Sequence, residues 1–270
     1  MKEIPNNKDY CFGTLAIGKL HQNLAKQLAL DLGDYSHKTT FIILTDDPSV
    51  FSNFPNVLAI KHIQEGPLLV LNDKRKVIER GLEKFSSVIF IDADCRIVKS
   101  LAENISWPPG ITVNHDTQRS FGDNFRKHCS SDQGIYDKLF KKIKLLISLD
   151  QCKFPIPNLF VITKDNGREK LFLEYWDKIA RYCEINRCKN VFEAYSIGLA
   201  MCCTGWNATS FNENEEFLDF YKSINHIGTY KKTKKQPKTF LDQQKTRCLY
   251  YYRWVKVCLK GLKDFGFYFR

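Results

Sequence analysis

The chain has 270 residues, of which 43% are hydrophobic and 26% are charged, and its formal net charge at pH 7 is +11. This composition excludes a wholly disordered chain and fits one large domain, or one domain with an appendage. The positive charge predicts an anionic partner, and nucleic acid, nucleotide phosphates and acidic membrane surfaces all qualify.

The cysteines and the N-terminus indicate a protein of the cytosol. Ten cysteines are too sparse for a small disulfide scaffold, and their spacing does not form the paired CxxC motif of a zinc ribbon. We therefore expect buried thiols in a reducing, cytoplasmic environment. Residues 1–9 are polar and predict no signal peptide, and no run approaches the ~18 apolar residues that a spanning helix needs.

The first hundred residues alternate apolar strands with amphipathic helices. Strands are predicted at 10–16, 39–44, 57–63 and from 88, and helices at 20–32, ending near Gly33, and at 70–84. Such alternation is typical of an α/β fold with a Rossmann-like, mostly parallel central sheet that helices cover on both faces. Ligands of these sheets bind beyond the carboxyl ends of the strands, where Thr14, Asp46 and Asp92 are expected.

The second half of the chain is more mixed. Further strands are predicted at 111–113, ending in Asn114-His115-Asp116, and at 159–162, and helices at 132–149, 169–182 and 191–202. The predicted domain covers 1–238, and a basic, aromatic extension follows at 239–270. The lysine-rich segment 231–238 is expected to be mobile.

The stretch VIFIDADCRIV, residues 88–98, places two carboxylates at the end of an apolar run. Asp92 and Asp94 point the same way if the chain stays extended, and two such carboxylates repel unless a cation lies between them. Mn²⁺ and Mg²⁺ prefer oxygen ligands, and the small Ala93 leaves the turn uncrowded. The alternative is a polar strand end in which Asp92 is a cap and Asp94 is solvated.

The stretch KRKVIERGLEKFSSVIFIDADCRIV resembles the metal-binding block of glycosyltransferases with the A-type fold, nearest to the family-eight, glycogenin- and galactosyltransferase-like enzymes. The resemblance implies that this DxD motif holds Mn²⁺, or Mg²⁺, against the diphosphate of a nucleotide-sugar, expected to be UDP-linked. It also implies that Arg75, or its rivals Lys74 and Lys76, reaches the donor. The alternative is an exposed basic helix face.

The resemblance also assigns a third metal ligand near the C-terminus. The stretch NHIGTYKK resembles the family's H-x-x-G-x-K motif, with one residue fewer between His226 and Gly228. His226 is then a metal ligand, and Lys231, or Lys232, contacts the diphosphate. A lone histidine at a surface or cap is the alternative.

The same family places further residues around the donor and the acceptor. FGTLAIG resembles its nucleotide-holding segment, so Thr14 would contact the base or ribose; Asp46 is a second candidate or only part of a turn. Asn158 stands where the family has an Asn-x-Gly motif, although the glycine is missing. Glu193 is the first candidate for the catalytic carboxylate and Asp116 the second, while a first-turn acid stabilised by the helix dipole is the alternative for Glu193.

These features predict a metal-dependent glycosyltransferase of polysaccharide biosynthesis, retaining rather than inverting, with a saccharide or lipid-linked acceptor. The basic, aromatic extension would contact an anionic membrane peripherally, or would pack on the core as a closing helix. The rivals are a Mg²⁺-dependent nucleotidyltransferase, an inactive lectin-like or scaffold relative, and a nucleic-acid-binding protein. Against the last of these, the sequence contains no recognised nucleic-acid reader motif.

Overall fold

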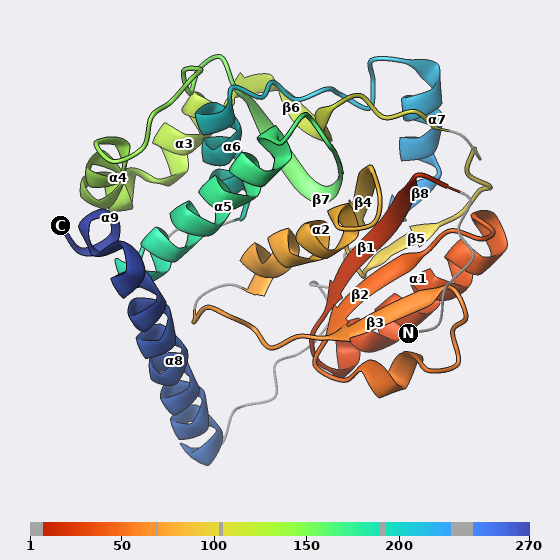
Figure 1. Ribbon diagram of the computed structural model, residues 1–270, viewed down its shortest axis with the longest axis horizontal. Coiled ribbons are helices and arrows are strands. Elements are labelled where there is room, and N and C mark those ends of the chain that lie inside the picture. The colour runs from red at the N-terminus through yellow and green to blue at the C-terminus, as the bar shows by residue number, and fades with distance from the viewer. Residues whose placement is uncertain (1–7, 68–69, 103–104, 190–192, 228–239) are drawn as a thin grey trace.

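The computed structural model describes residues 8–67, 70–102, 105–189, 193–227 and 240–270, without the side chains of 115–119 and 240–242. The predicted mobile segment 231–238 therefore lies outside the described residues. The architecture is α/β, with a six-stranded, mostly parallel sheet flanked by helices, as expected (Figure 1).

The strand order in the central sheet is β3-β2-β1-β4-β7-β6. The first four are mutually parallel, while β7 is antiparallel to both of its neighbours. The bounds are β1 (Tyr10–Ala16), β2 (Phe41–Thr45), β3 (Val57–Lys61), β4 (Ser87–Ile91), β6 (Gly110–Ser120) and β7 (Lys153–Thr163). A second sheet pairs two short antiparallel strands, β5 (Cys95–Ile97) with β8 (Ile224–His226).

Two hydrophobic cores cover the two faces of the central sheet. On one face, α1 (Lys19–Tyr35) and α7 (Glu215–Lys222) pack with the side chains of Phe12, Ile43 and Ile89. The other core contains α2 (Lys74–Leu82), α5 (Arg168–Ile185) and α6 (Glu193–Thr204), together with α3 (Phe121–His128) and α4 (Gln133–Phe140). Since β1 connects to α1 on one face and β4 follows α2 on the other, the crevice expected for a ligand lies between β1 and β4.

Several predicted elements differ from the observed ones. Helix α1 continues past Gly33, and Leu20 on the predicted apolar face is exposed, whereas Leu28 and Leu32 are buried. Strands β6 and β7 are longer than predicted, so His115 and Asp116 lie within β6 and not beyond its end. The helix predicted at 132–149 ends at Phe140, because the backbone beyond it bonds to α6 instead: Leu146 N–H donates to the Cys202 carbonyl at 2.9 Å.

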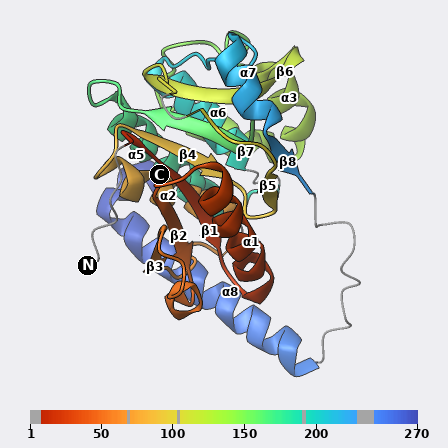
Figure 2. The same cartoon turned by 90° about the vertical axis from the view of Figure 1, so that its right-hand side faces the viewer.

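The C-terminal segment forms α8 (Phe240–Gly261), a short 3₁₀ turn (Leu262–Asp264) and α9 (Phe265–Phe269). Helix α8 packs on α5 along part of its length, and its N-terminal half projects from the body of the molecule (Figure 2). No helix in the described part of the chain combines the length and the apolar character needed to cross a membrane.

Gly13 in β1 is expected to be indispensable for packing, because a Cβ there would lie 2.5 Å from Cγ1 of Val77 on α2. Val77 is fully buried, and its β-branched side chain is restricted in χ1, so it cannot easily rotate away from an added Cβ. We expect Gly13→Ala to lower the free energy of unfolding by about 1–3 kcal/mol through overpacking. In the matched control, Gly33→Ala within α1 meets no atom within 4 Å, and should raise stability by about 0.5–1 kcal/mol. Urea unfolding of both variants measures the contrast, and equal effects would contradict it.

Candidate functional site

The DxD segment does not continue β4 as an extended strand. Strand β4 ends at Ile91, and the Asp92 N–H donates to the Asn158 carbonyl of the neighbouring β7 at 2.9 Å. The chain then turns, and the Cys95 N–H donates back to the Asp92 carbonyl at 3.0 Å. The condition under which Asp92 and Asp94 would point the same way is therefore not met, and each carboxylate contacts a different side chain.

The cation beside Asp92 is a buried lysine. Lys74 is the first residue of α2 and is only 1% exposed. Its Nζ lies 2.9 Å from Asp92 Oδ1 and 3.1 Å from Glu193 Oε1, and it also donates to the Pro157 carbonyl at 2.9 Å. Three oxygens therefore satisfy the three donors of one ammonium group, and Lys74 holds Asp92 and Glu193 next to each other.

The ionisation of this cluster follows from burial and charge together. Burial alone would lower the pKa of Lys74, but the two carboxylates outweigh it and raise the pKa above its usual range. Burial raises the pKa of Asp92; Lys74 opposes this shift, whereas the nearby carboxylates of Glu193 and Asp94 reinforce it. The side chain of Asp92 still has 24% of its surface exposed, so this carboxyl group remains open to a ligand.

The partner of Asp94 comes from a distant part of the chain. The short strands β5 and β8 pair so that Cys95 lies opposite His226, and Nε2 of His226 lies 3.3 Å from Oδ1 of Asp94. The Ile227 N–H, which donates to the Asp94 carbonyl at 3.1 Å, extends this pairing. The structure thus brings together Asp94 and His226, as the sequence analysis expected, whereas Lys231 and Lys232 lie outside the described residues.

The chemistry of this cluster fits a divalent cation. Ligand atoms of Asp94, Cys95 and His226 all lie within 4.8 Å of one another, and the oxygen and the imidazole nitrogen are acceptable donors for Mn²⁺. Cys95 was not expected here, and no sequence signal marks it. This thiol is fully buried, and burial raises its pKa well above the usual range, so it is a neutral group at the base of the cluster.

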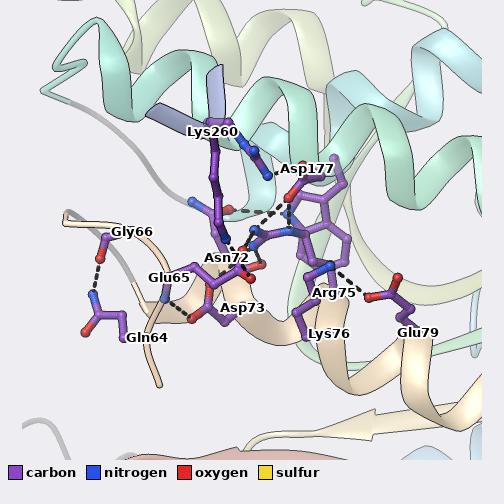
Figure 3. Close-up of polar contacts among 12 residues, drawn as sticks. Gln64, Glu65, Gly66, Asn72, Asp73, Arg75, Lys76, Glu79, Asp177 and Lys260 are labelled. Atoms are coloured by element: carbon purple, nitrogen blue, oxygen red, sulfur yellow. Dashed lines mark hydrogen bonds and ion pairs between the residues drawn. The ribbon is translucent and has the colours of Figure 1, made fainter. Parts of the chain in front are cut away.

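Arg75 does not face this cluster. Its guanidinium group lies among three carboxylates on the side of α5, with Nε 2.9 Å from Asp177 Oδ1 and NH2 2.9 Å from Glu65 Oε2, and with Asp73 Oδ1 3.3 Å from NH1 (Figure 3). Successive helical residues are rotated by about 100°, so α2 directs Lys74 and Arg75 to different sides. Lys74, the rival candidate, is the residue that contacts Asp92. The other rival, Lys76, forms an exposed pair with Glu79.

The predicted nucleotide contacts fall into two groups. Oγ1 of Thr14 in β1 and Oδ1 of Asn158 in β7 are buried and have no hydrogen-bond partner among the described residues. Buried polar atoms without partners are uncommon, so both are candidate contacts for a ligand or water. Asp46, in contrast, already accepts from Gly18 N–H at 2.9 Å and from Gln22 Nε2 at 2.8 Å, and it thereby fixes the start of α1.

The two candidate catalytic carboxylates differ in what can be said of them. Glu193 begins α6, is 7% exposed and shares Lys74 with Asp92, so it belongs to the cluster. The side chain of Asp116 lies outside the described residues.

The cysteines are unpaired and eight of the ten are buried, which agrees with the expectation of buried thiols.

Comparison with known proteins adds no relative. The chain matches no protein-family model, and a search of curated proteins found no significant match. The functional argument therefore depends on the geometry at the carboxyl edge of β4.

Proposed function

We propose that this chain is a metal-dependent glycosyltransferase of the A-type fold, which transfers a sugar from a nucleoside-diphosphate sugar to an acceptor hydroxyl group. The observation that carries the proposal is the 3.3 Å contact between Asp94 and His226, which are far apart in sequence and meet beside the cluster of Asp92, Lys74 and Glu193. These residues lie beyond β4, next to the crevice where an open α/β sheet binds its ligands.

Asp94 and His226 would hold a divalent cation, Mn²⁺ or Mg²⁺, at the cluster that they form with Cys95; Asp92, which the sequence analysis also expected as a ligand, is not part of that cluster. When bound, the cation supplies positive charge that offsets the charge of the departing diphosphate. Lys74 fixes Asp92 by binding Oδ1, and this leaves Oδ2 without a partner among the described residues. The buried oxygens of Thr14 and Asn158, which have no other described partner, would contact the donor only if the crevice opened.

Glu193 is the carboxylate proposed to face the transferred sugar. Lys74 binds its Oε1, so the side chain is held in one orientation, and Oε2 has no partner among the described residues. A carboxylate held in one orientation by Lys74 is suited to stabilise positive charge that develops at the sugar. The family resemblance favours retention over inversion.

The test is a panel of sugar nucleotides with Mn²⁺, in which slow release of the nucleoside diphosphate is measured by chromatography. We expect release from one donor, and a rate lower by about 10²–10³-fold in Asp94→Asn and His226→Gln. Mn²⁺ affinity, followed by electron paramagnetic resonance, should fall by about 10–100-fold in the same variants. Asp137→Asn, on the exposed surface of α4, is the matched control and should retain both properties.

Three outcomes would contradict the proposal. One is a protein that neither binds nor turns over any sugar nucleotide, which would favour an inactive relative of the fold. Another is consumption of a nucleoside triphosphate with release of pyrophosphate, which would indicate nucleotidyl transfer. The third is salt-dependent retention on DNA in the absence of nucleotide-sugar turnover, which would favour a nucleic-acid-binding protein.

A further inference from the structure

The outer face of α8 carries an exposed apolar stripe. Tyr252, Val255, Leu259 and Leu262 follow one another at three- and four-residue spacing, so they lie on one side of the helix and its 3₁₀ continuation. Their exposed fractions are 60%, 47%, 59% and 53%. Further large apolar side chains of the same segment are exposed as well: Leu249, Tyr251, Phe265 and Phe269. No described residue of the chain covers this stripe.

The opposite side of α8 is firmly attached to the body, so the exposure of the stripe is a fixed property of the fold. Val257 is 3% exposed, and Trp254 Nε1 donates to the Ile185 carbonyl at the end of α5 at 3.4 Å. Arg253 donates to Gln64 Oε1 at 2.7 Å, and Lys260 Nζ lies 3.3 Å from Glu65 Oε1. These contacts set the rotation of α8 about its axis and turn the apolar stripe outward.

Beside the stripe, α8 and α9 enclose a hollow of ≈ 510 Å³ with the end of α5. Its walls are mainly apolar and include Val255, Leu259 and Phe269, while Lys138, Lys142 and Arg270 also line it. Lys142 fixes α9 here by donating to the Gly266 carbonyl at 2.9 Å, and Figure 1 shows α9 beside α4. An apolar hollow bordered by cations suits an acyl chain that ends in an anionic headgroup.

The charge of the segment identifies the kind of surface that fits it. Residues 240–270 contain seven lysines or arginines and two aspartates. Lys256 and Lys263, both exposed, each follow a residue of the stripe directly, and Lys256 Nζ lies 5.3 Å from the centre of the Tyr252 ring. A helix with an apolar face, adjacent lysines and aromatic residues is typical of segments that lie in the interface of an anionic bilayer.

Other occupants fit less well. A second copy would bring the same lysines against themselves, and the chain as a whole has a net charge of +11. Nucleic acid would satisfy the lysines, but it would leave Val255, Leu259 and Leu262 against a polar phosphate backbone. An anionic lipid bilayer satisfies both the apolar stripe and the adjacent lysines, because it has an apolar interior below a layer of negatively charged headgroups.

We propose that the outer face of α8 and α9 docks peripherally on an anionic lipid bilayer, with the apolar stripe in the interfacial region and the lysines on lipid phosphates. Glu65 contacts both Lys260 on the attached side of α8 and Arg75 of α2, so α8 lies between the docked face and the first turn of α2, which carries Lys74. The docking itself does not depend on the proposed transferase activity.

The test is co-sedimentation of the full chain with vesicles of phosphatidylcholine alone or with roughly a third phosphatidylglycerol. We expect binding to the anionic vesicles, weakened by salt, and little binding to phosphatidylcholine alone. Leu259→Glu/Leu262→Glu and Lys256→Glu/Lys263→Glu should each lower the partition coefficient by about tenfold or more. Leu20→Glu/Leu30→Glu, on the exposed face of α1, changes the same residue types elsewhere and should bind as the wild type does.

Tryptophan fluorescence offers a second measurement. Trp254 lies on the attached side of α8, whereas Tyr252 is 60% exposed in the stripe, so Tyr252→Trp should show a blue shift of emission on vesicle addition that the wild type does not. Unchanged binding of the stripe and lysine variants would overturn the proposal, as would equal binding to both vesicle types. A wild-type dimer that Leu259→Glu/Leu262→Glu dissociates, without vesicle binding, would assign the face to a second copy instead.

Discussion

Arg75→Met is expected to lower the free energy of unfolding by about 3–5 kcal/mol, the cost of removing one partner from a buried ionic cluster. Arg75 is 6% exposed, and its guanidinium group contacts Asp73, Asp177 and Glu65. Methionine fills a similar volume but leaves these carboxylates, one of them almost fully buried, without their shared cation. Urea unfolding at neutral pH measures the loss, and Arg75→Lys should recover only part of it because a point charge cannot satisfy three acceptors in a fixed plane.

The matched control for Arg75→Met is Lys76→Met, the next residue of the same helix. Lys76 forms an exposed pair with Glu79 at 2.8 Å, and such pairs contribute about 0–1 kcal/mol. Similar losses in the two variants would contradict the burial argument. A double-mutant cycle of Arg75→Met with Asp177→Asn should show a coupling free energy, since the two side chains bond directly.

The pH dependence of the Arg75 effect has a definite sign. Burial alone would raise the pKa of Asp177, but Arg75 and Arg181 outweigh it, so the folded pKa lies below the ordinary value of 3.8. The stabilisation from this pair is therefore fully present above pH 3.8 and is lost as the pH falls through the lower, folded pKa. We expect the difference between wild type and Arg75→Met to be constant near neutrality and to shrink in acid. A difference that instead grew in acid would contradict the assignment.

The first half of the fold was predictable because its signals are local. Strands β1, β2, β3 and β4 are short, nearly continuous apolar runs, and each is found within two residues of its predicted start. The extra length of β6 is polar, and that of β7 contains two prolines; both follow from pairing between the two strands, with register shifts that no periodicity indicates. The strand β8 has three residues and exists through its pairing with β5, so only the structure could reveal it.

Two missed helices did carry a readable signal. Ser120 caps α3 by accepting from the Asp123 N–H at 3.0 Å, and Asn214 caps α7 by accepting from the Phe217 N–H at 2.8 Å. Both caps are residue types that favour helix starts, and the first is followed three positions later by an acid. Attention to caps in addition to apolar periodicity would have located these helices.

Part of the candidate site was predicted from the sequence, but Cys95 and the pairing of Lys74 with Asp92 were not. The approach of His226 to Asp94 was expected from a motif, whereas the choice of Lys74 over Arg75 depends on the rotation of α2, which sequence spacing does not fix. A helix shifted by one residue would exchange these two cations. Arg75 is instead bound by Glu65 and Asp177. Both lie on segments that are far from the DxD motif in the sequence, so the motif alone does not indicate this pairing.

Lys74→Met is expected to abolish most of the proposed activity, with nucleoside diphosphate release lower by about 10²–10³-fold, because Lys74 positions two carboxylates at once. Without the ammonium, Asp92 and Glu193 are like charges in a buried place, and one of them should take up a proton. The variant should also lose about 3–5 kcal/mol of stability at neutral pH. The pKa of Lys74 is raised in the fold, so its stabilisation is present below its ordinary value of 10.5 and is lost as the pH rises through the folded pKa.

A second substitution tests whether the stability loss comes from the stranded carboxylates. Lys74→Met/Glu193→Leu removes one of the two, so it should regain stability relative to Lys74→Met, while activity stays low because Glu193 also belongs to the site. Lys84→Met, which removes an exposed lysine just beyond the same helix, should change neither property. If the double variant regained activity along with stability, Lys74 would act only through folding and Glu193 would not be needed for the reaction. If Lys74→Met kept both stability and activity, the bridge between Asp92 and Glu193 would have no part in the site.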